Sequence, residues 1–300
     1  MKHIIESQQF DQKIINVIFS MADGLEKKTD DSLKGKILAS LFYEPSTRTR
    51  FSFESAMLRL GGNVIATENA KEFSSAAKGE TLEDSIRVIG NYADVIVLRH
   101  YEKNASKRAS LVSKIPVINA GDGTGQHPTQ ALLDLYTIRK EFGRIDKIAI
   151  ALVGDLKHGR TIRSLAYLLG KYDGIKIYFV SPKALKVGDD IKKYLKRHAI
   201  WYEETEDLSA VVCKVDVVYQ TRIQQERFSS KKEYKKFKGC YTIDLPLVRR
   251  MKTKSIIMHP LPRVDEISPE VDESPKAVYF KQAHYGLLIR MALLKYIFMA

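Results

Sequence analysis

The spacing of apolar positions near the N-terminus predicts a long amphipathic helix. Between residues 7 and 28, large apolar side chains recur every three or four positions, which places them on one face of a helix. These side chains are Phe10, Ile14, Ile18, Met21 and Leu25. We expect this face to pack against the rest of the domain.

The remainder of the first half alternates between short apolar runs and helical patterns. The run Val95–Leu98 is apolar throughout, as expected of a strand covered on both faces. Helical patterns such as Thr81–Tyr92 and Thr129–Phe142 lie between such runs. The expected strands here are Gly35–Phe42, Asn63–Thr67, Ala93–Leu98 and Ile115–Asn119. Strand and helix in alternation predict a parallel α/β sheet.

The same alternation starts again after Gly143. The expected strands are Lys147–Val153, Ile175–Val180, Val215–Tyr219 and Ser255–Met258. We therefore predict two Rossmann-like domains, residues 1–143 and 144–283, each with a parallel sheet flanked by helices. A C-terminal helix, residues 284–300, is expected to pack back on the first domain. The length of 300 residues agrees with two domains at roughly 150 residues each.

The amino-acid composition limits the classes of partner that the protein is expected to bind. The 49 Lys and Arg against 36 Asp and Glu give a formal charge of +13, which favours nucleic acid, acidic lipid or a multiply charged small substrate. Two cysteines, in no CxxC pair, argue against a disulfide scaffold and a zinc site, so a cytoplasmic location is expected. Arg290 and Lys295 interrupt the apolar C-terminal stretch, so no membrane segment is expected.

The densest polar motif is Ser46-Thr47-Arg48-Thr49-Arg50, which follows an expected strand and opens an expected helix. Helix N-termini present unpaired N–H groups, and hydroxyl and guanidinium groups add donors that suit a phosphate. The alternative is an ordinary N-cap followed by surface arginines.

A second motif, Gly121 to Gln130, also lies between a strand and a helix and holds His127. Its glycines allow the backbone to approach a ligand closely, and ligands of open α/β sheets bind at this edge. A glycine-rich turn with a capping histidine is the alternative. The loop that contains Ser74 and Lys78 is by itself an ordinary exposed loop.

The second half carries three more motifs after strands: Gly154–Arg160, Thr221–Gln224 and His259–Arg263. There is no G-x-G-x-x-G and no Walker motif, which disfavours a dinucleotide or ATP cofactor. No nucleophile motif or metal-ligand cluster is evident. We therefore expect no cofactor and no metal, and a direct transfer driven by positioning and charge.

At this point the chain resembles a known family over essentially its whole length. Phe42 to Glu54 looks like the carbamoyl-phosphate signature of the aspartate/ornithine carbamoyltransferase family, and Gln126 to Gln130 is similar to its second motif. The three later motifs resemble the aspartate branch. The ornithine branch would show an Asp-x-x-x-Ser-Met-Gly segment and a His-Cys-Leu-Pro turn. Arginines also suit the second carboxylate of aspartate, whereas the amine of ornithine would need an acidic partner.

The resemblance implies a role for each matching residue. Carbamoyl phosphate would be bound by Ser46, Thr47, Arg48, Thr49, Arg99, His127, Gln130, Leu261 and Pro262. Aspartate would be bound by Lys78, Arg160, Arg222 and Gln224. Ser74 and Lys78 would come from a neighbouring subunit of a homotrimer with shared active sites. Arg48, Thr49, Lys78, Arg99 and His127 would be catalytic.

The implied reaction transfers the carbamoyl group to the α-amine of L-aspartate. Carbamoyl phosphate would bind first, the second domain would close over aspartate, and N-carbamoyl-L-aspartate and phosphate would leave, a step of pyrimidine biosynthesis towards UMP. The alternatives are a carbamoyltransferase for another amine such as ornithine and, more remotely, a basic nucleic-acid-binding protein. The basic stretches 183–197 and 231–238 match no motif and are expected to be solvated faces, and a regulatory chain is a possible partner.

Overall fold

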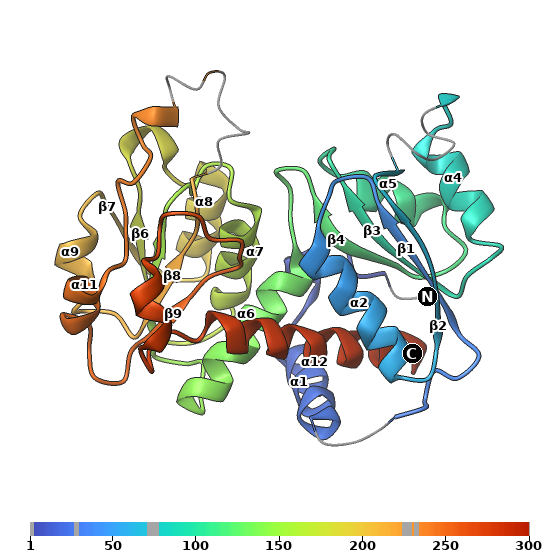
Figure 1. Ribbon diagram of the computed structural model, residues 1–300, viewed down its shortest axis with the longest axis horizontal. Helices are drawn as coiled ribbons and strands as arrows, with labels where there is room; N and C mark the ends of the chain where they lie inside the picture. The colour runs from blue at the N-terminus through green and yellow to red at the C-terminus, as the bar shows by residue number, and fades with distance from the viewer. Residues whose placement is uncertain (1–2, 27–29, 71–77, 224–229, 231–233, 300) are drawn as a thin grey trace. The chain divides into compact units, whose positions relative to one another are not determined.

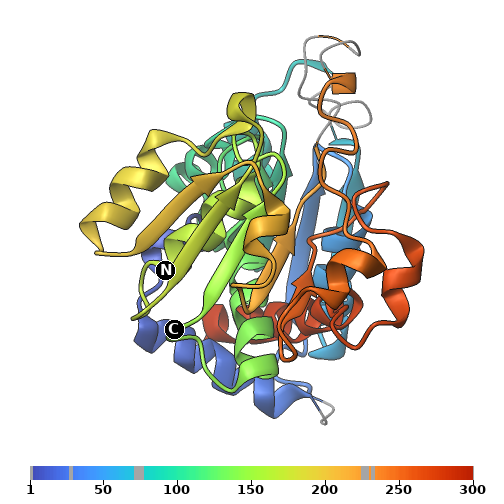
Figure 2. The same cartoon turned by 90° about the vertical axis from the view of Figure 1, so that its left-hand side faces the viewer.

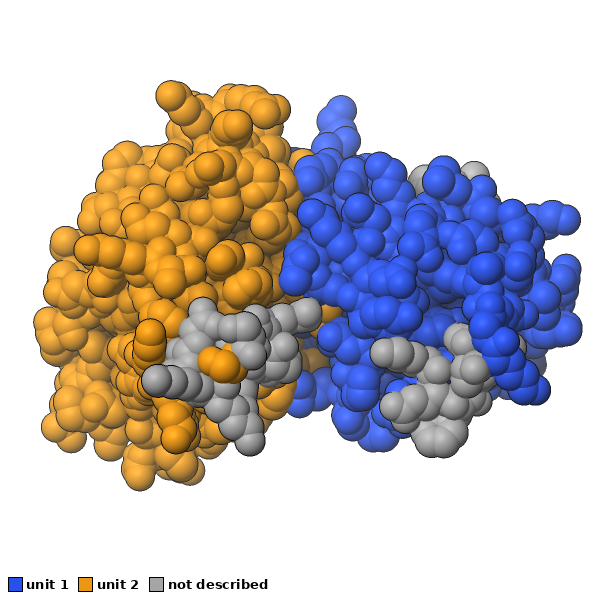
Figure 3. All heavy atoms as spheres, turned by 90° about the horizontal axis from the view of Figure 1, so that it is seen from above, with its two compact units in different colours: residues 1–136, 284–300 blue, residues 137–283 orange. Residues whose placement is uncertain are grey.

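The computed structural model describes residues 3–26, 30–70, 78–223, 230 and 234–299. It contains two compact units, residues 1–136 with 284–300 and residues 137–283, which Figure 3 colours separately. The helices α6 (Pro128–Phe142) and α12 (Tyr279–Phe298) each contribute residues to both units. Among the described residues, no helix is long and apolar enough to cross a membrane.

The first unit is built on a four-stranded parallel sheet with the order β2-β1-β3-β4. Its strands are β1 (Ile37–Phe42), β2 (Asn63–Glu68), β3 (Val95–His100) and β4 (Val117–Asp122). Its helices, besides α6 and α12, are η1 (Ser7–Gln9), α1 (Gln12–Leu25), α2 (Thr47–Arg59), α4 (Leu82–Ile89) and α5 (Ala105–Val112). Figure 1 shows α1, α2 and α12 on one side of this sheet and α4 and α5 on the other.

The second unit is built on a five-stranded parallel sheet with the order β7-β6-β5-β8-β9. Its strands are β5 (Ala149–Val153), β6 (Lys176–Val180), β7 (Trp201–Thr205), β8 (Val217–Gln220) and β9 (Ile256–Met258). Its helices are α7 (Arg160–Leu169), η3 (Lys183–Leu185), α8 (Asp189–Arg197), α9 (Leu208–Val211), α11 (Leu245–Arg249) and η5 (Pro269–Glu273). Figure 2, which faces this unit, shows the strands between two groups of helices.

The predicted fold class is confirmed, because both units are parallel sheets flanked by helices. The apolar face predicted for the first helix is confirmed only at Ile18 and Leu25, since Ile14 and Met21 are only partly buried. Asp11 accepts a hydrogen bond from the Ile14 N–H and starts α1 there, so Phe10 lies outside the helix. The buried face of α1 is formed by Ile15, Ile18, Phe19, Ala22 and Leu25.

Two other element predictions differ from the structure. The last helix begins at Tyr279 and not near His284. The exposed strand β7 was not predicted, because its sequence Trp-Tyr-Glu-Glu-Thr carries too little apolar signal. Part of the basic stretch 183–197 forms α8, whose Ile191 and Leu195 are buried while Lys193 and Lys196 are exposed.

Candidate active site

The motif Ser46–Arg50 lies at the N-terminus of α2, directly after strand β1. Within the described residues, the Ser46 side chain makes no capping hydrogen bond to this helix, and the first turn carries no acidic residue. The simple N-cap alternative is therefore not supported. Thr47 and Arg48 are exposed and Thr49 is buried. The positive end of the helix dipole and the basic side chains here all favour an anion.

Arg99 brings a second guanidinium to the same edge of the sheet. It is only 9% exposed, at the end of β3, and its Nη1 donates to the Ala120 carbonyl at 3.2 Å. Its Nε donates to the Glu44 carboxylate at 2.8 Å. Tyr43, in the loop before α2, bonds through its N–H to the Arg99 carbonyl at 2.8 Å. Strands β1 and β3 thus place Arg99 and the α2 N-terminus side by side.

The glycine-rich turn after β4 is organised by Asp122, which was not among the predicted site residues. Its carboxylate accepts from the Gln126 N–H at 2.8 Å and from the Asn104 N–H at 2.9 Å. A Cβ on Gly125 would lie 2.5 Å from the Asp122 carboxylate, so this position requires glycine. The turn holds His127, which is 3% exposed and lies just before α6.

Gln130 has a fixed orientation on α6. Its Nε2 donates to Asp134 Oδ1 at 2.9 Å, and the Asp134 side chain is fully buried. The amide oxygen of Gln130 therefore points away from Asp134, as an acceptor for an N–H group. The buried Arg290 of α12 supplies a positive charge to Asp134, and burial lowers the pKa of Arg290 to about 10 despite that carboxylate.

In the second unit, the motif residues follow three neighbouring parallel strands. Arg160 starts α7 after β5, and Arg222 follows β8, the strand that pairs with β5. Both arginine side chains are partly buried. Gly154 has φ +116°, and a Cβ there would lie 2.3 Å from the Thr221 carbonyl oxygen. The absence of a side chain at Gly154 therefore allows the loop after β5, which leads to Arg160, to lie close to the loop after β8, which carries Arg222.

The turn that contains Leu261 and Pro262 follows β9, the next strand of the same sheet. Leu261 has φ +53°. The buried His259 accepts a hydrogen bond from the Leu261 N–H through Nδ1 at 2.7 Å. Its Nε2 lies 2.8 Å from the carboxylate of the buried Glu266.

Ser74 and Gln224 lie outside the described residues. Lys78 is described and exposed. Over the described part of the chain, no group of three or more His, Cys, Asp or Glu side chains could hold a metal ion.

Comparison with protein families gives two adjacent matches that together cover nearly the whole chain. Residues 2–140 match the carbamoyl-phosphate-binding domain of the aspartate/ornithine carbamoyltransferases. Residues 146–297 match the aspartate/ornithine-binding domain of the same family.

Individual relatives agree with these matches. The chain is 58% identical to the chloroplastic aspartate carbamoyltransferase of Arabidopsis thaliana, over 97% of this chain and 76% of that protein. It superposes on the catalytic subunit of M. jannaschii aspartate transcarbamoylase with a TM-score of 0.92 and 52% identity, covering 100% and 98% of the two chains. It superposes equally well on the Trypanosoma cruzi enzyme in complex with carbamoyl phosphate and aspartate, with a TM-score of 0.93, 42% identity and coverage of 98% and 95%.

Proposed function

The chain belongs to the aspartate/ornithine carbamoyltransferase family, and on this premise we propose how its own residues carry out the reaction. The reaction is the transfer of the carbamoyl group of carbamoyl phosphate to the α-amine of L-aspartate, which gives N-carbamoyl-L-aspartate and phosphate. The observation that carries this conclusion is the pair of family matches, 2–140 and 146–297, with relatives named for aspartate and not for ornithine.

The first unit supplies the contacts to carbamoyl phosphate in this proposal. Ser46, Thr47, Arg48 and Thr49 bind the phosphate at the α2 N-terminus, where backbone N–H groups and the helix dipole add to the side chains. Arg99 also binds it, and the phosphate takes the place that the Glu44 carboxylate holds on Arg99. His127 donates to the carbamoyl oxygen. Gln130 accepts from the carbamoyl amide, as its orientation by Asp134 allows.

The second unit supplies the contacts to aspartate. Arg160 and Arg222 bind its carboxylates, and guanidinium groups suit carboxylates because they can donate two parallel hydrogen bonds. Gln224 is assigned to the same substrate. The Leu261 and Pro262 carbonyls accept from the carbamoyl amide, so they select a carbamoyl group over a bare phosphate.

Catalysis then follows from positioning and charge. The neutral α-amine of aspartate attacks the carbamoyl carbon, and the carbonyl oxygen becomes an oxyanion. Arg48, Thr49 and His127 stabilise this oxyanion. The C–O bond to phosphate then breaks, the attacking nitrogen gives up one proton to the departing phosphate, and Arg48, Arg99 and Lys78 offset the charge of that phosphate.

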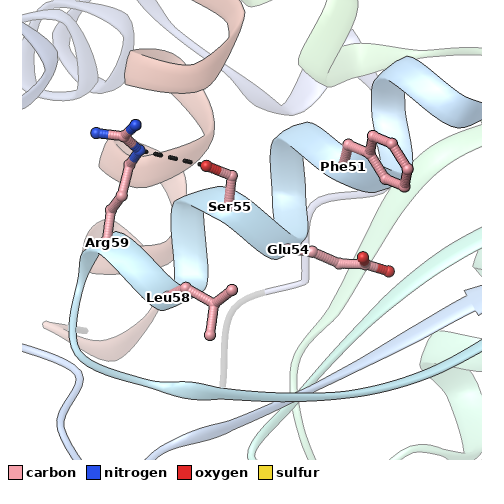
Figure 4. A pocket seen from close by; sticks show the side chains of 5 residues that line it. All are labelled: Phe51, Glu54, Ser55, Leu58 and Arg59. Carbon is pink, nitrogen blue, oxygen red and sulfur yellow. Dashed lines mark hydrogen bonds between the residues drawn. The ribbon is translucent and has the colours of Figure 1, made fainter.

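The proposal includes a homotrimer in which each site is shared between two chains. Lys78, together with Ser74, reaches the site of the neighbouring chain. An exposed apolar face on α2 supports such an assembly, since Phe51 is 54% and Leu58 is 59% exposed. Phe51 and Leu58 line a shallow depression together with Glu54, Ser55 and Arg59, and Figure 4 shows these side chains along α2. We assign a second copy of the chain as its occupant, because α2 begins at the phosphate-binding residues and a neighbour packed along it lies next to the site.

Complementation between two inactive variants tests the shared site. Chains with Arg48→Ala and chains with Lys78→Ala are each expected to be nearly inactive alone. A mixed trimer contains interfaces in which an intact Arg48 meets an intact Lys78, so dissociation and reassociation of the mixture should restore activity. The control is each variant taken alone through the same cycle. Mixed trimers without activity would contradict the shared site.

We assign the product to pyrimidine biosynthesis. The cytoplasmic location stays a prediction, because the Arabidopsis relative is named as chloroplastic. Neither ornithine as acceptor nor nucleic-acid binding finds support in the relatives described above.

A further inference from the structure

The turn after β9 places an ordinary side chain in an uncommon backbone conformation. Leu261 has φ +53°, in the left-handed region that residues other than glycine seldom adopt. Such a conformation persists when the surrounding structure holds it in place, and it is often found where a backbone group must face a ligand. The contacts that fix the backbone of Leu261 therefore also determine the direction in which its carbonyl oxygen points.

The buried His259 holds this turn from the N-terminal side. Its Nδ1 accepts the hydrogen bond from the Leu261 N–H at 2.7 Å, so Nδ1 carries no proton. The imidazole proton is then on Nε2, which donates to Glu266 Oε1 at 2.8 Å. His259 itself is fixed in place, because its backbone N–H donates to Gln282 Oε1 of α12 at 2.9 Å.

Glu266 holds the turn from the C-terminal side. Its second oxygen, Oε2, accepts from the N–H groups of Val264 at 3.1 Å and Asp265 at 3.2 Å. Burial alone would raise the pKa of Glu266, but hydrogen bonds from His259 and the backbone lower its pKa below the usual value. One ionised carboxylate thus fixes both the imidazole tautomer and the far end of the turn.

We propose that His259 and Glu266 form a positioning pair that fixes the Leu261 and Pro262 carbonyls for recognition of the carbamoyl amide. Neither side chain touches the substrate in this proposal. They act through the backbone of residues 261–265, and the inference rests on the proposed function because that function assigns these carbonyls to the carbamoyl group.

Three substitutions separate the parts of the pair. In His259→Asn, the side-chain oxygen occupies the place of Nδ1 and can keep the bond to the Leu261 N–H. In His259→Gln, the side-chain amide reaches the place of Nε2, so the bond to Glu266 is kept and the bond to Leu261 is lost. In Glu266→Gln, the side-chain shape is kept, but the amide nitrogen replaces one of the two accepting oxygens. It must face either the imidazole N–H or the backbone N–H groups, so the hydrogen bonds on that side are lost.

Two measurements on the full-length protein test the proposal. The first is hydrogen–deuterium exchange of the peptide that spans residues 256–268. The second compares the affinity for carbamoyl phosphate with the inhibition constant for inorganic phosphate, which has no carbamoyl group and serves as an internal control. A general loss of structure would weaken both ligands, whereas a misplaced turn weakens only carbamoyl phosphate.

We expect His259→Gln and Glu266→Gln to speed exchange in this peptide and to lower the affinity for carbamoyl phosphate about tenfold, the effect of one hydrogen bond. Inorganic phosphate should bind as in the wild type, and His259→Asn should lose less than His259→Gln. Unchanged exchange, or equal losses for both ligands, would overturn the positioning role. If the wild type bound carbamoyl phosphate no better than phosphate, the proposed carbamoyl contact of this turn would fail, while the exchange data would still report the pair itself.

Discussion

In the proposed site, individual arginines carry most of the positive charge that faces the substrates. Arg48 and Arg99 lie at the edge of the first sheet, and Arg160 and Arg222 follow adjacent strands of the second. Arg48 is exposed and Arg160 and Arg222 are only partly buried, so replacing one of these three should remove charge without disturbing a core, whereas Arg99 is buried against Glu44 and the Ala120 carbonyl. A single substitution of such an exposed or partly buried arginine can therefore test its role in the reaction without a large loss of stability.

Arg48→Ala should reduce kcat heavily and leave the fold intact. Arg48 is exposed at the start of α2, and loss of one donor to a developing oxyanion typically costs about 10²–10³ in rate. The measurement is steady-state formation of carbamoyl-aspartate, with circular dichroism as the check on folding. Arg87→Ala, which replaces an exposed arginine on α4, is the matched control and should keep full activity. A fully active Arg48→Ala enzyme would remove Arg48 from the mechanism.

The sequence identified the charged residues proposed to face the ligand more readily than the residues that orient those side chains. Arg48 and His127 stand in recognisable motifs, and Arg99 was assigned through the family resemblance. Asp134 gave no such signal, and Glu44, although it lies within the signature Phe42 to Glu54, was assigned no role, because a carboxylate that orients another side chain is recognised only by its three-dimensional neighbours. A polar residue one helical turn from a motif residue, such as Asp134 after Gln130, is the one sequence cue that could have pointed to this role.

At the scale of elements, the approach of β5 to β8 depends on the absence of a side chain at Gly154. Gly154→Ala would bring a Cβ within 2.3 Å of the Thr221 carbonyl oxygen at φ +116°. The loops with Arg160 and Arg222 should then move apart, which should raise KM for aspartate and lower the free energy of unfolding.

The matched control for this prediction is Gly143→Ala. Gly143 has φ +71°, but nothing lies within 4 Å of the position that a Cβ would take there, so only the backbone preference of about 1–2 kcal/mol is lost. Urea unfolding and aspartate kinetics of both variants make the comparison. Equal stability losses and equal KM values would show that the contact with Thr221 does not matter.

The helix α12 contributes to the first unit through a buried charge. Arg290 donates to Ser52 Oγ of α2 at 2.6 Å and lies over the Phe53 ring at 5.2 Å. Arg290→Met would leave the buried Asp134 without this counter-charge, which should cost about 3–5 kcal/mol of stability in urea unfolding.

The control for this prediction is Lys281→Met, also on α12. This substitution removes the ion pair of an exposed lysine with Glu141 and should cost about 1 kcal/mol or less. Similar losses of stability for the two variants would argue against the role of Arg290.

The order of strands and helices was predictable because each buried strand is a short apolar run. The ends of the helices were less predictable from the sequence, since side-chain caps such as Asp11 determine where a helix begins. The exposed edge strand β7 was missed for the opposite reason: pairing with β6, not apolar burial, defines it.

At the scale of the whole molecule, the apolar face of α2 predicts how copies of the chain assemble. Phe51→Glu and Leu58→Glu should weaken the proposed trimer in sedimentation velocity and reduce activity at least tenfold, because in that proposal Lys78 would no longer reach a neighbouring site. A buried charge without a partner at an interface is strongly unfavourable.

Leu111→Glu on α5 is the control for assembly. Leu111 is 79% exposed, more than either residue of α2, yet lies on a different face of the sheet. This variant should remain trimeric and active. If all three variants sedimented as the wild type does, α2 would not be the interface.

The most direct test of the central claim is a colorimetric assay of the purified chain with carbamoyl phosphate and either L-aspartate or L-ornithine. The family matches and the arginines after β5 and β8 predict carbamoylated product with aspartate alone. Product with ornithine alone would contradict the assignment of the second unit, and a folded trimer that makes product with neither would contradict the activity itself.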